Sequence, residues 1–210
     1  MTDFLFDGPA GAPVTVLLAH GAGAPMDSAA MMAAARALAA EGLRVARFEF
    51  AYMAARRTAA GKRPPPRAES VMPEYAAAIA ALGATDKLVI GGKSMGGRVA
   101  SMLADELHAA GRVAGLLCLG YPFHPLGKPG QLRTGHLMQM RCPALIVQGT
   151  RDPMGSREEV AGYSLSPAIR ILWLEDGDHD LRPRKVVSGF TAADHLRSMA
   201  SAVKDFAAGL

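Results

Sequence analysis

Ser94 stands at the centre of the motif GKSMG (residues 92–96), with a glycine two residues away on either side. Residues 87–92 are typical of a buried strand, and residues 95–109 are typical of a helix. A sharp strand-to-helix turn strains the backbone at its central residue, and the flanking glycines let neighbouring segments approach. The hydroxyl would then lie at a helix N-terminus, where partial positive charge favours an oxyanion. The motif predicts a nucleophilic serine; the alternative is a glycine-rich turn with an idle serine.

A serine hydroxyl needs a base to take its proton, and the base needs an acid to orient it. His179 follows the last predicted strand, and Asp152 follows the strand before it. Serine, aspartate and histidine then occur in the chain order expected for a triad at the carboxyl ends of a parallel α/β sheet. Asp176 and Asp178 compete as acids, but their closeness to His179 in sequence fits turn or surface groups better. We expect Ser94, Asp152 and His179 to act together.

Two backbone N–H groups are candidates to bind the oxyanion of a tetrahedral intermediate. The N–H of Met95 follows the nucleophile directly. The N–H of Ala22 lies between Gly21 and Gly23, which leave the backbone open to an oxygen; the alternative is a plain turn. His20, just before this loop, is expected to brace it rather than to transfer protons.

Two rival glycine-rich sites fail at single positions. A phosphate-binding loop ending in GKS (residues 92–94) requires a glycine at position 87, where the chain has Lys87. A dinucleotide-binding turn beginning with GAG (residues 21–23) requires a third glycine at position 26, where the chain has Met26. We expect no cofactor at either place.

Alternating strands and helices must position these groups. The predicted strands are Val14–Ala19, Arg44–Phe50, Lys87–Gly92, Ala114–Gly120, Pro143–Gly149 and Ile169–Glu175, with a candidate seventh at Phe4–Phe6. The first predicted helix is capped by Asp27 or Ser28 and runs to about Ala40. The other predicted helices are Glu69–Leu82, Met95–Ala109, Arg157–Gly162 and Ala192–Ala208. Residues 51–68 and 121–130 are expected to be loops. Strands that are apolar throughout indicate a mostly parallel α/β sheet of about six or seven strands with helices on both faces. Ligand sites of such sheets lie at the carboxyl ends of the strands.

Length and composition fit one α/β domain over residues 1–210, without room for a large lid. Half of the residues are hydrophobic and a fifth are charged, which is globular rather than disordered composition. No apolar run could cross a membrane, and residues 1–7 lack the basic residues of a secretory signal, so a cytoplasmic protein is expected. Two cysteines without a C-x-x-C pair predict no disulfide framework and no metal site. The sequence does not indicate an oligomeric state.

The net charge is +4, and much of the basic character falls in residues 56–67. This segment is either a solvated loop or a binding site for nucleic acid or an anionic substrate. No aromatic residues interleave with its charges, so nucleic-acid binding is not expected. Arg56 and Arg57 are candidates to clamp a substrate carboxylate. Lys93, beside the nucleophile, either pairs with Glu49 or is solvated.

Five further residues at strand ends are candidates to line an apolar acyl pocket, with ordinary loop packing as the alternative. They are Tyr52, Met53, Tyr121, Phe123 and His124.

These features together resemble the α/β-hydrolase fold over about residues 3–208. Five segments look more narrowly like the KANL/Tex30-type α/β-hydrolase-like group, which is similar to dienelactone hydrolases: APMDS (24–28), RFEFAYM (47–53), GGKSMGGRVAS (91–101), GYPFHP (120–125) and WLEDGDHDL (173–181). The resemblance implies the fold, a triad of Ser94, Asp152 and His179, and no cofactor. The chain departs from dienelactone hydrolases in carrying Ser94 where they carry cysteine, so their substrate does not transfer.

The sequence therefore predicts a hydrolase of small esters or thioesters that works through an acyl-enzyme intermediate. The alternative is a catalytically silent binding or scaffold module with the same fold. A nucleic-acid-binding protein that uses residues 56–67 ranks last.

Overall fold

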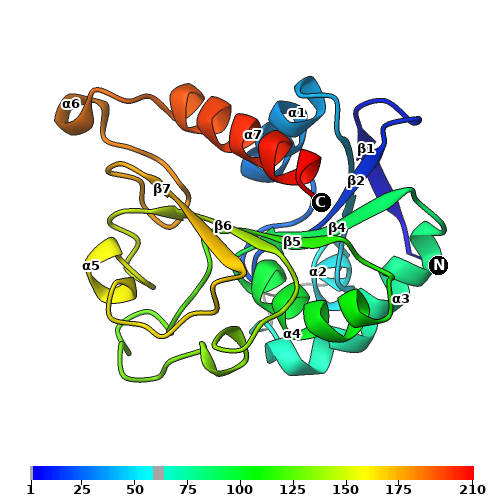
Figure 1. Cartoon of the computed structure of the whole chain (residues 1–210), viewed down its shortest axis with the longest axis horizontal. Helices are drawn as coiled ribbons and strands as arrows, with labels where there is room; N and C mark the ends of the chain where they lie inside the picture. The colour runs from blue at the N-terminus through cyan, green and yellow to red at the C-terminus, as the bar shows by residue number, and fades with distance from the viewer. Residues whose placement is uncertain (1, 59–63) are drawn as a thin grey trace.

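A single seven-stranded sheet runs through the computed structural model, which describes residues 2–58 and 64–210 (Figure 1). Its strands are β1 (Phe4–Asp7), β2 (Val14–Ala19), β3 (Arg44–Phe48), β4 (Lys87–Lys93), β5 (Gly115–Leu119), β6 (Ala144–Gly149) and β7 (Ile169–Leu174). Their order is β1-β3-β2-β4-β5-β6-β7, and every neighbouring pair is parallel except β1 with β3. The predicted strands, including the candidate seventh, are confirmed to within one or two residues at their ends.

Helices cover both faces of the sheet, as predicted. They are α1 (Ala29–Ala40), α2 (Ala51–Ala55), α3 (Met72–Leu82), α4 (Met95–Ala109), α5 (Arg157–Val160), α6 (Lys185–Ser188) and α7 (Ala192–Ala208), with 3₁₀ helices η1 (Ala68–Val71) and η2 (Gly135–Leu137). Helices α1 and α7 lie on one face, and α3 and α4 on the other (Figure 1). Among the described residues, no large lid domain covers the sheet, and none of the helices has the length and apolar character to cross a bilayer.

One part of the predicted loop 51–68 is wrong, because residues 51–55 form α2. The segment is rich in alanine, which favours a helix. The N–H of Ala51, which has no partner within the helix, donates to the carboxylate of Glu74 over 2.7 Å. The side chain of Met53 is buried in the core. The expectation of a continuous loop missed these tertiary contacts.

The central strands are apolar throughout because both of their faces are buried. In β2, Leu17 and Ala19 belong to the core under α3 and α4, whereas Val16 and Leu18 belong to the core under α1 and α7. Alternate side chains of a strand point to opposite faces, so each needs an apolar residue. A sheet covered in this way leaves its carboxyl edge as the place where polar groups can meet.

Tyr75 of α3 ties this helix to the strand that leads to Ser94. Its ring is fully buried. Its hydroxyl accepts the N–H of Gly91 over 2.8 Å and lies 2.7 Å from the Gly91 carbonyl and 3.0 Å from that of Leu17. Burial raises the pKa of Tyr75, so the hydroxyl keeps its proton and can donate to a carbonyl. This contact holds β4 three residues before the nucleophile.

Replacing Tyr75 by phenylalanine is expected to lower the free energy of unfolding by about 1–3 kcal/mol, because it leaves a buried N–H and buried carbonyls without this partner. Urea unfolding of Tyr75→Phe measures the loss. Tyr163→Phe is the matched control, because the Tyr163 hydroxyl makes no hydrogen bond to a described residue. Equal unfolding midpoints for the two variants would contradict the assignment.

Candidate active site

The turn between β4 and α4 places Ser94 in a strained conformation, with φ of 51° and ψ of −113°. Non-glycine residues rarely adopt positive φ. A Cβ atom on Gly92 or on Gly96 would lie 2.4 Å from the Ala19 carbonyl oxygen. Only glycine at both positions lets the end of β2 pack against the turn. The spacing of the motif therefore reflects this close approach.

The structure brings Ser94, His179 and Asp152 together at the carboxyl ends of β4, β7 and β6. The Oγ atom of Ser94 lies 2.9 Å from Nε2 of His179, and Nδ1 of His179 lies 2.8 Å from Oδ2 of Asp152. A carboxylate only accepts hydrogen bonds, so Nδ1 carries the proton and Nε2 is left to accept the serine proton. Asp152 is fully buried, whereas a quarter of the His179 side chain is exposed (24%). Nε2 of His179 can therefore accept the proton of Ser94 Oγ, and the exposed part of the ring lets it pass that proton to a group in solvent.

Gln148 is a partner of Asp152 that the sequence reasoning missed. Its Nε2 donates to Oδ2 of Asp152 over 2.9 Å, and its Oε1 accepts the N–H of Tyr121 over 2.7 Å. The other carboxylate oxygen of Asp152 accepts the N–H of Met154 over 2.8 Å. These donors fix the carboxylate against His179. The available signal was the one polar side chain in the apolar strand ALIVQG (residues 144–149).

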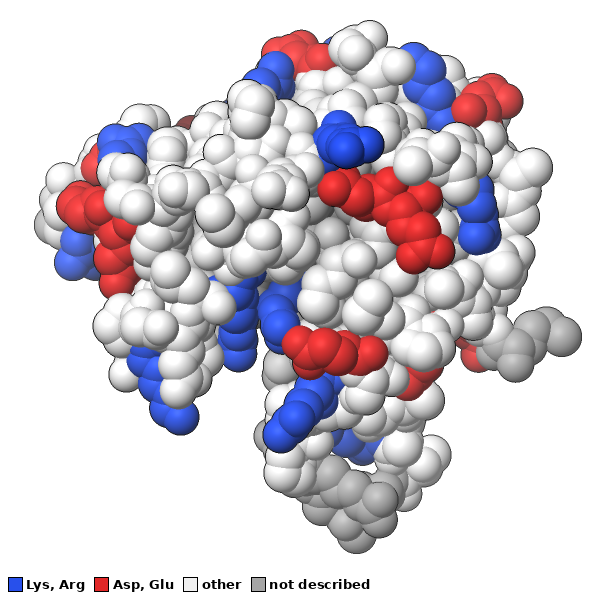
Figure 2. All heavy atoms as spheres, turned by 60° about the horizontal axis from the view of Figure 1, so that its bottom comes forward, with Lys and Arg blue, Asp and Glu red and all other residues white. Residues whose placement is uncertain are grey.

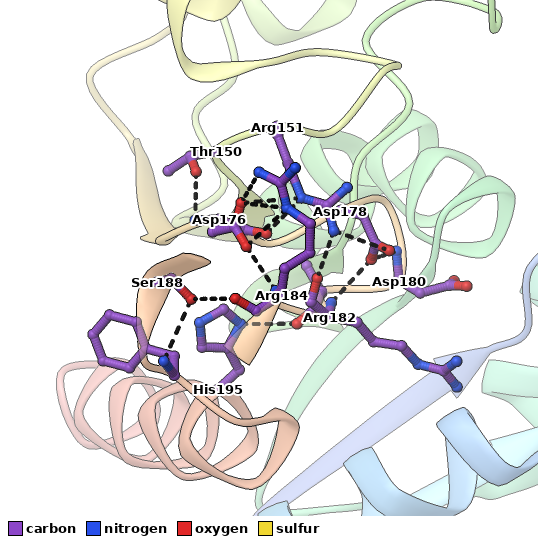
Figure 3. Close-up of polar contacts among 11 residues, drawn as sticks. Thr150, Arg151, Asp176, Asp178, Asp180, Arg182, Arg184, Ser188 and His195 are labelled. Carbon is purple, nitrogen blue, oxygen red and sulfur yellow. Dashed lines mark hydrogen bonds and ion pairs between the residues drawn. The ribbon is translucent and has the colours of Figure 1, made fainter. Parts of the chain in front are cut away.

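The loop that carries His179 is held by ion pairs (Figure 3). The Asp176 carboxylate accepts the backbone N–H and the guanidinium of Arg184, and it pairs with Arg151 at 3.3 Å. The Arg184 guanidinium lowers the pKa of Asp176 to about 2. Oδ1 of Asp178 accepts the N–H groups of Asp180 and Arg182, both over 2.9 Å. Both acids therefore act within the loop, in agreement with the expectation that they are turn groups.

Lys93 supports the same loop from the other side. Its Nζ donates to the His179 carbonyl over 2.7 Å and lies 3.4 Å from the Asp180 carboxylate. Burial lowers the pKa of Lys93. Neither alternative for Lys93 is correct: the Glu49 carboxylate binds the guanidinium of Arg57 instead, and the Lys93 side chain is largely buried rather than solvated.

The two candidate oxyanion donors lie beside the nucleophile. Ala22, Ser94 and Met95 line one cavity, and neither the Ala22 nor the Met95 N–H donates to a residue in the described part of the chain. His20 braces the Ala22 loop, as expected. Its Nε2 accepts the Phe50 N–H over 3.1 Å, so Nδ1 carries the proton that is donated to the Gly21 carbonyl over 2.6 Å. Burial lowers the pKa of His20, which keeps it neutral.

The cavity that opens at Ser94 has a volume of about 680 Å³. Its walls are Ala22, Pro65, Pro66, Arg67, Ala68, Glu69, Ser94, Met95, Arg98, Pro122, Pro125, Gln131, Leu132, Arg133 and Met154. None of the seven residues expected to line a substrate pocket is among them. Four of the seven are buried in the core, Tyr52 donates its hydroxyl to the Ala22 carbonyl over 3.2 Å, and the two arginines have other partners.

Among the predicted pocket residues, Met53, Tyr121, Phe123 and His124 are buried, each at most 4% exposed. Their apolar surface is removed from water in the core instead of facing a cavity. The segment after β5 lines the cavity through other residues, which include Pro122, Pro125 and Arg133.

Arg56 and Arg57, the candidates to clamp a substrate carboxylate, do not line the cavity at Ser94 and have partners within the protein. Arg57 binds the carboxylates of Asp27 and Glu49 at 2.8 Å each, so its charge is already balanced. Arg56 lies over the Tyr52 ring, 5.1 Å from its centroid, and donates to the Ala22 carbonyl over 3.3 Å. Lys62 and Arg63 of the basic segment lie outside the described residues.

No metal-binding arrangement occurs among the described residues, since no three His, Cys, Asp or Glu side chains are grouped to hold an ion. A second serine–histidine pair joins Ser101 of α4 to His136 of η2 at 2.8 Å. No carboxylate in the described chain hydrogen-bonds His136, and Ser101 also donates to the Arg98 carbonyl over 2.7 Å. This pair lacks the oriented acid that the Ser94 array has.

Comparison with known proteins concerns the fold of the whole chain. A family model described as an alpha/beta hydrolase domain matches residues 12–208. Similar solved structures include a dienelactone hydrolase from Anabaena variabilis, which is 19% identical with a TM-score of 0.70 over 98% of this chain and 90% of that chain. At this identity the likeness shows the fold alone.

Two further structures share the fold. An α/β serine hydrolase without a lid from Xanthomonas campestris is 20% identical, with a TM-score of 0.67 over 98% of this chain and 87% of that chain. Est1E from Butyrivibrio proteoclasticus, solved with ferulic acid bound, is 15% identical, with a TM-score of 0.68 over 99% of this chain and 94% of that chain. The narrower resemblance to the KANL/Tex30-type group stays a prediction.

Replacing Gly96 by alanine is expected to destabilise the protein, although alanine normally favours a helix. The new Cβ would lie 2.4 Å from the Ala19 carbonyl oxygen and 2.7 Å from that of His20. Overpacking of this kind costs about 1–3 kcal/mol. Urea unfolding of Gly96→Ala measures it against Gly11→Ala, where nothing lies within 4 Å of the new atom. A Gly96→Ala protein as stable as the control would refute the packing argument.

Proposed function

Since the chain belongs to the alpha/beta hydrolase family, we propose that it is a serine hydrolase that cleaves a small ester or thioester through Ser94, His179 and Asp152. The observation that carries the proposal is the unbroken hydrogen-bonded array from Ser94 Oγ through the imidazole to a buried carboxylate. Its donor and acceptor order is the one that a nucleophilic serine requires.

In the first step, Oγ of Ser94 attacks the acyl carbon while Nε2 of His179 takes its proton. The negative charge that develops on the acyl oxygen is bound by the N–H groups of Ala22 and Met95. Asp152 stabilises the imidazolium through Nδ1. When the intermediate collapses, the bond to the leaving oxygen or sulfur breaks, and Nε2 returns the proton to the leaving group.

In the second step, water replaces the leaving group. Nε2 of His179 takes a proton from water as the water oxygen attacks the acyl carbon. The bond between the acyl carbon and Oγ of Ser94 then breaks, and the imidazole returns the proton to Oγ. The acid product leaves, and the array is restored. With no large lid among the described residues, substrates are expected to be small or to enter by one end, and we retain the cytoplasm as the expected location.

The alanine variant at Ser94 is expected to lose nearly all turnover of 4-nitrophenyl butyrate and to keep its melting temperature, because it loses the nucleophile and little packing. Steady-state hydrolysis and labelling by a fluorophosphonate probe measure the loss. Ser101→Ala is the matched control, because it removes the hydroxyl of the second serine–histidine pair. A Ser94→Ala protein with full activity, or a folded wild-type protein that neither turns over esters nor reacts with the probe, would favour a silent binding module.

The asparagine variant at Asp152 is expected to lower kcat by about 10⁴-fold, because the imidazole then loses its oriented tautomer. Asp86→Asn, an exposed position, is the control and should retain wild-type kcat. Rates are compared at one pH for both proteins after their folding has been checked by circular dichroism. An Asp152→Asn enzyme within a few-fold of wild type would remove Asp152 from the mechanism.

A further inference from the structure

The cavity at Ser94 has an unbalanced charge. Its described walls contain three arginines, Arg67, Arg98 and Arg133, and one acid, Glu69. Two positive charges are therefore in excess on walls that are otherwise built mainly from proline, alanine and other uncharged residues. In the face drawn in Figure 2, basic side chains border a hollow in the lower part of the view, with acidic side chains beside them.

The arginines differ in how their guanidinium groups are satisfied. Arg98 pairs with Glu69, but its buried Nε–H has no acceptor. The guanidinium groups of Arg67 and Arg133 make no hydrogen bond or ion pair with any residue that the structure describes. Arg133 is half-buried. Burial lowers the pKa of Arg133, and repulsion from Arg98 lowers it further.

This pattern contrasts with the other arginines beside the site. Arg57 binds two carboxylates, and Arg184 and Arg151 bind Asp176. Acids thus pair with these three arginines, whereas Arg67 and Arg133 in the cavity have no such partner within residues 2–58 and 64–210. A half-buried guanidinium beside another cation gains most from an anion that arrives with a ligand.

We propose that Arg67 and Arg133 bind an anionic group, a carboxylate or a phosphate, on the ester or thioester that Ser94 cleaves. This inference rests on the proposed function and narrows its substrate class. A guanidinium can bind either anion with two parallel hydrogen bonds, which orients the substrate as well as attracting it.

The position of the arginines relative to Ser94 fits a single substrate. Ser94 directly precedes α4 and Arg98 lies in the first turn of that helix, and both residues line the cavity. Arg133 lies in the segment after β5, and Arg67 directly precedes η1. The three arginines therefore reach one cavity from different segments of the chain. An ester held between these walls can present its acyl carbon to Ser94 while its anion meets the arginines.

The test compares three substrates of the wild-type enzyme. They are 4-nitrophenyl butyrate, which is neutral, the mono-4-nitrophenyl ester of glutaric acid, which carries a carboxylate on the acyl side, and butyryl-CoA, which carries phosphates on the leaving group. The expected result is a higher kcat/KM for at least one anionic substrate than for the neutral ester. The preferred one identifies the source of the anion. A preference for the neutral ester over both would overturn the proposal.

The variants Arg133→Gln and Arg67→Gln then locate the effect. The ratio of kcat/KM for the preferred anionic substrate to that for the neutral ester is expected to fall about 10-fold or more in Arg133→Gln, because a charge-assisted hydrogen bond is lost. Arg141→Gln, an exposed arginine outside the cavity, should keep the wild-type ratio. An unchanged ratio in both cavity variants would overturn the assignment.

Binding in the Ser94→Ala background separates failure of this inference from failure of the proposed function. Calorimetric titration with glutarate and with inorganic phosphate requires no turnover. Binding of either anion that weakens about 10-fold or more in Arg133→Gln supports the anion site even if no ester is hydrolysed. Absence of binding, or equal binding in Ser94→Ala and its Arg133→Gln derivative, counts against the site even if neutral esters are cleaved.

Discussion

The close approach between the end of β2 and the turn at Ser94 is the contact on which the site depends. The Ala19 carbonyl occupies the space that a side chain at Gly92 or Gly96 would need. This packing holds Ser94 at a positive φ, a conformation that a free chain would leave. Tyr75 of α3 adds to the restraint through its hydrogen bond with Gly91. Packing in the core of the sheet therefore offsets the energetic cost of the strained backbone at Ser94.

A second restraint is electrostatic and concerns Asp152. A buried carboxylate is costly unless its oxygens are hydrogen-bonded. Gln148, Met154 and His179 supply those donors, so the acid is fixed before any substrate arrives. Preorganised polar groups of this kind need no rearrangement when charge develops on the imidazole. The array is therefore consistent with the proposed chemistry in geometry and in donor order.

Strands, layers and the convergence of Ser94, Asp152 and His179 could be predicted from the sequence, because period and strand-end rules depend on local pattern. The substrate cavity could not. Whether a residue after a strand faces the cavity or the core depends on how its loop packs, and Tyr121 and Phe123 turn inward. Arg133 lies far along the same segment, where no local signal marks it. The partner of Lys93 likewise depended on a tertiary contact with the His179 loop.

That contact has a consequence for the whole catalytic cycle. Lys93 directly precedes Ser94 in the chain, and its ammonium donates a hydrogen bond to the main-chain oxygen of His179. In the proposed reaction, an acylated Ser94 has no hydroxyl proton with which to retain the imidazole. The lysine tether does not involve that proton, so it persists while the seryl ester exists. The His179 imidazole would thus stay beside the seryl ester until water arrives.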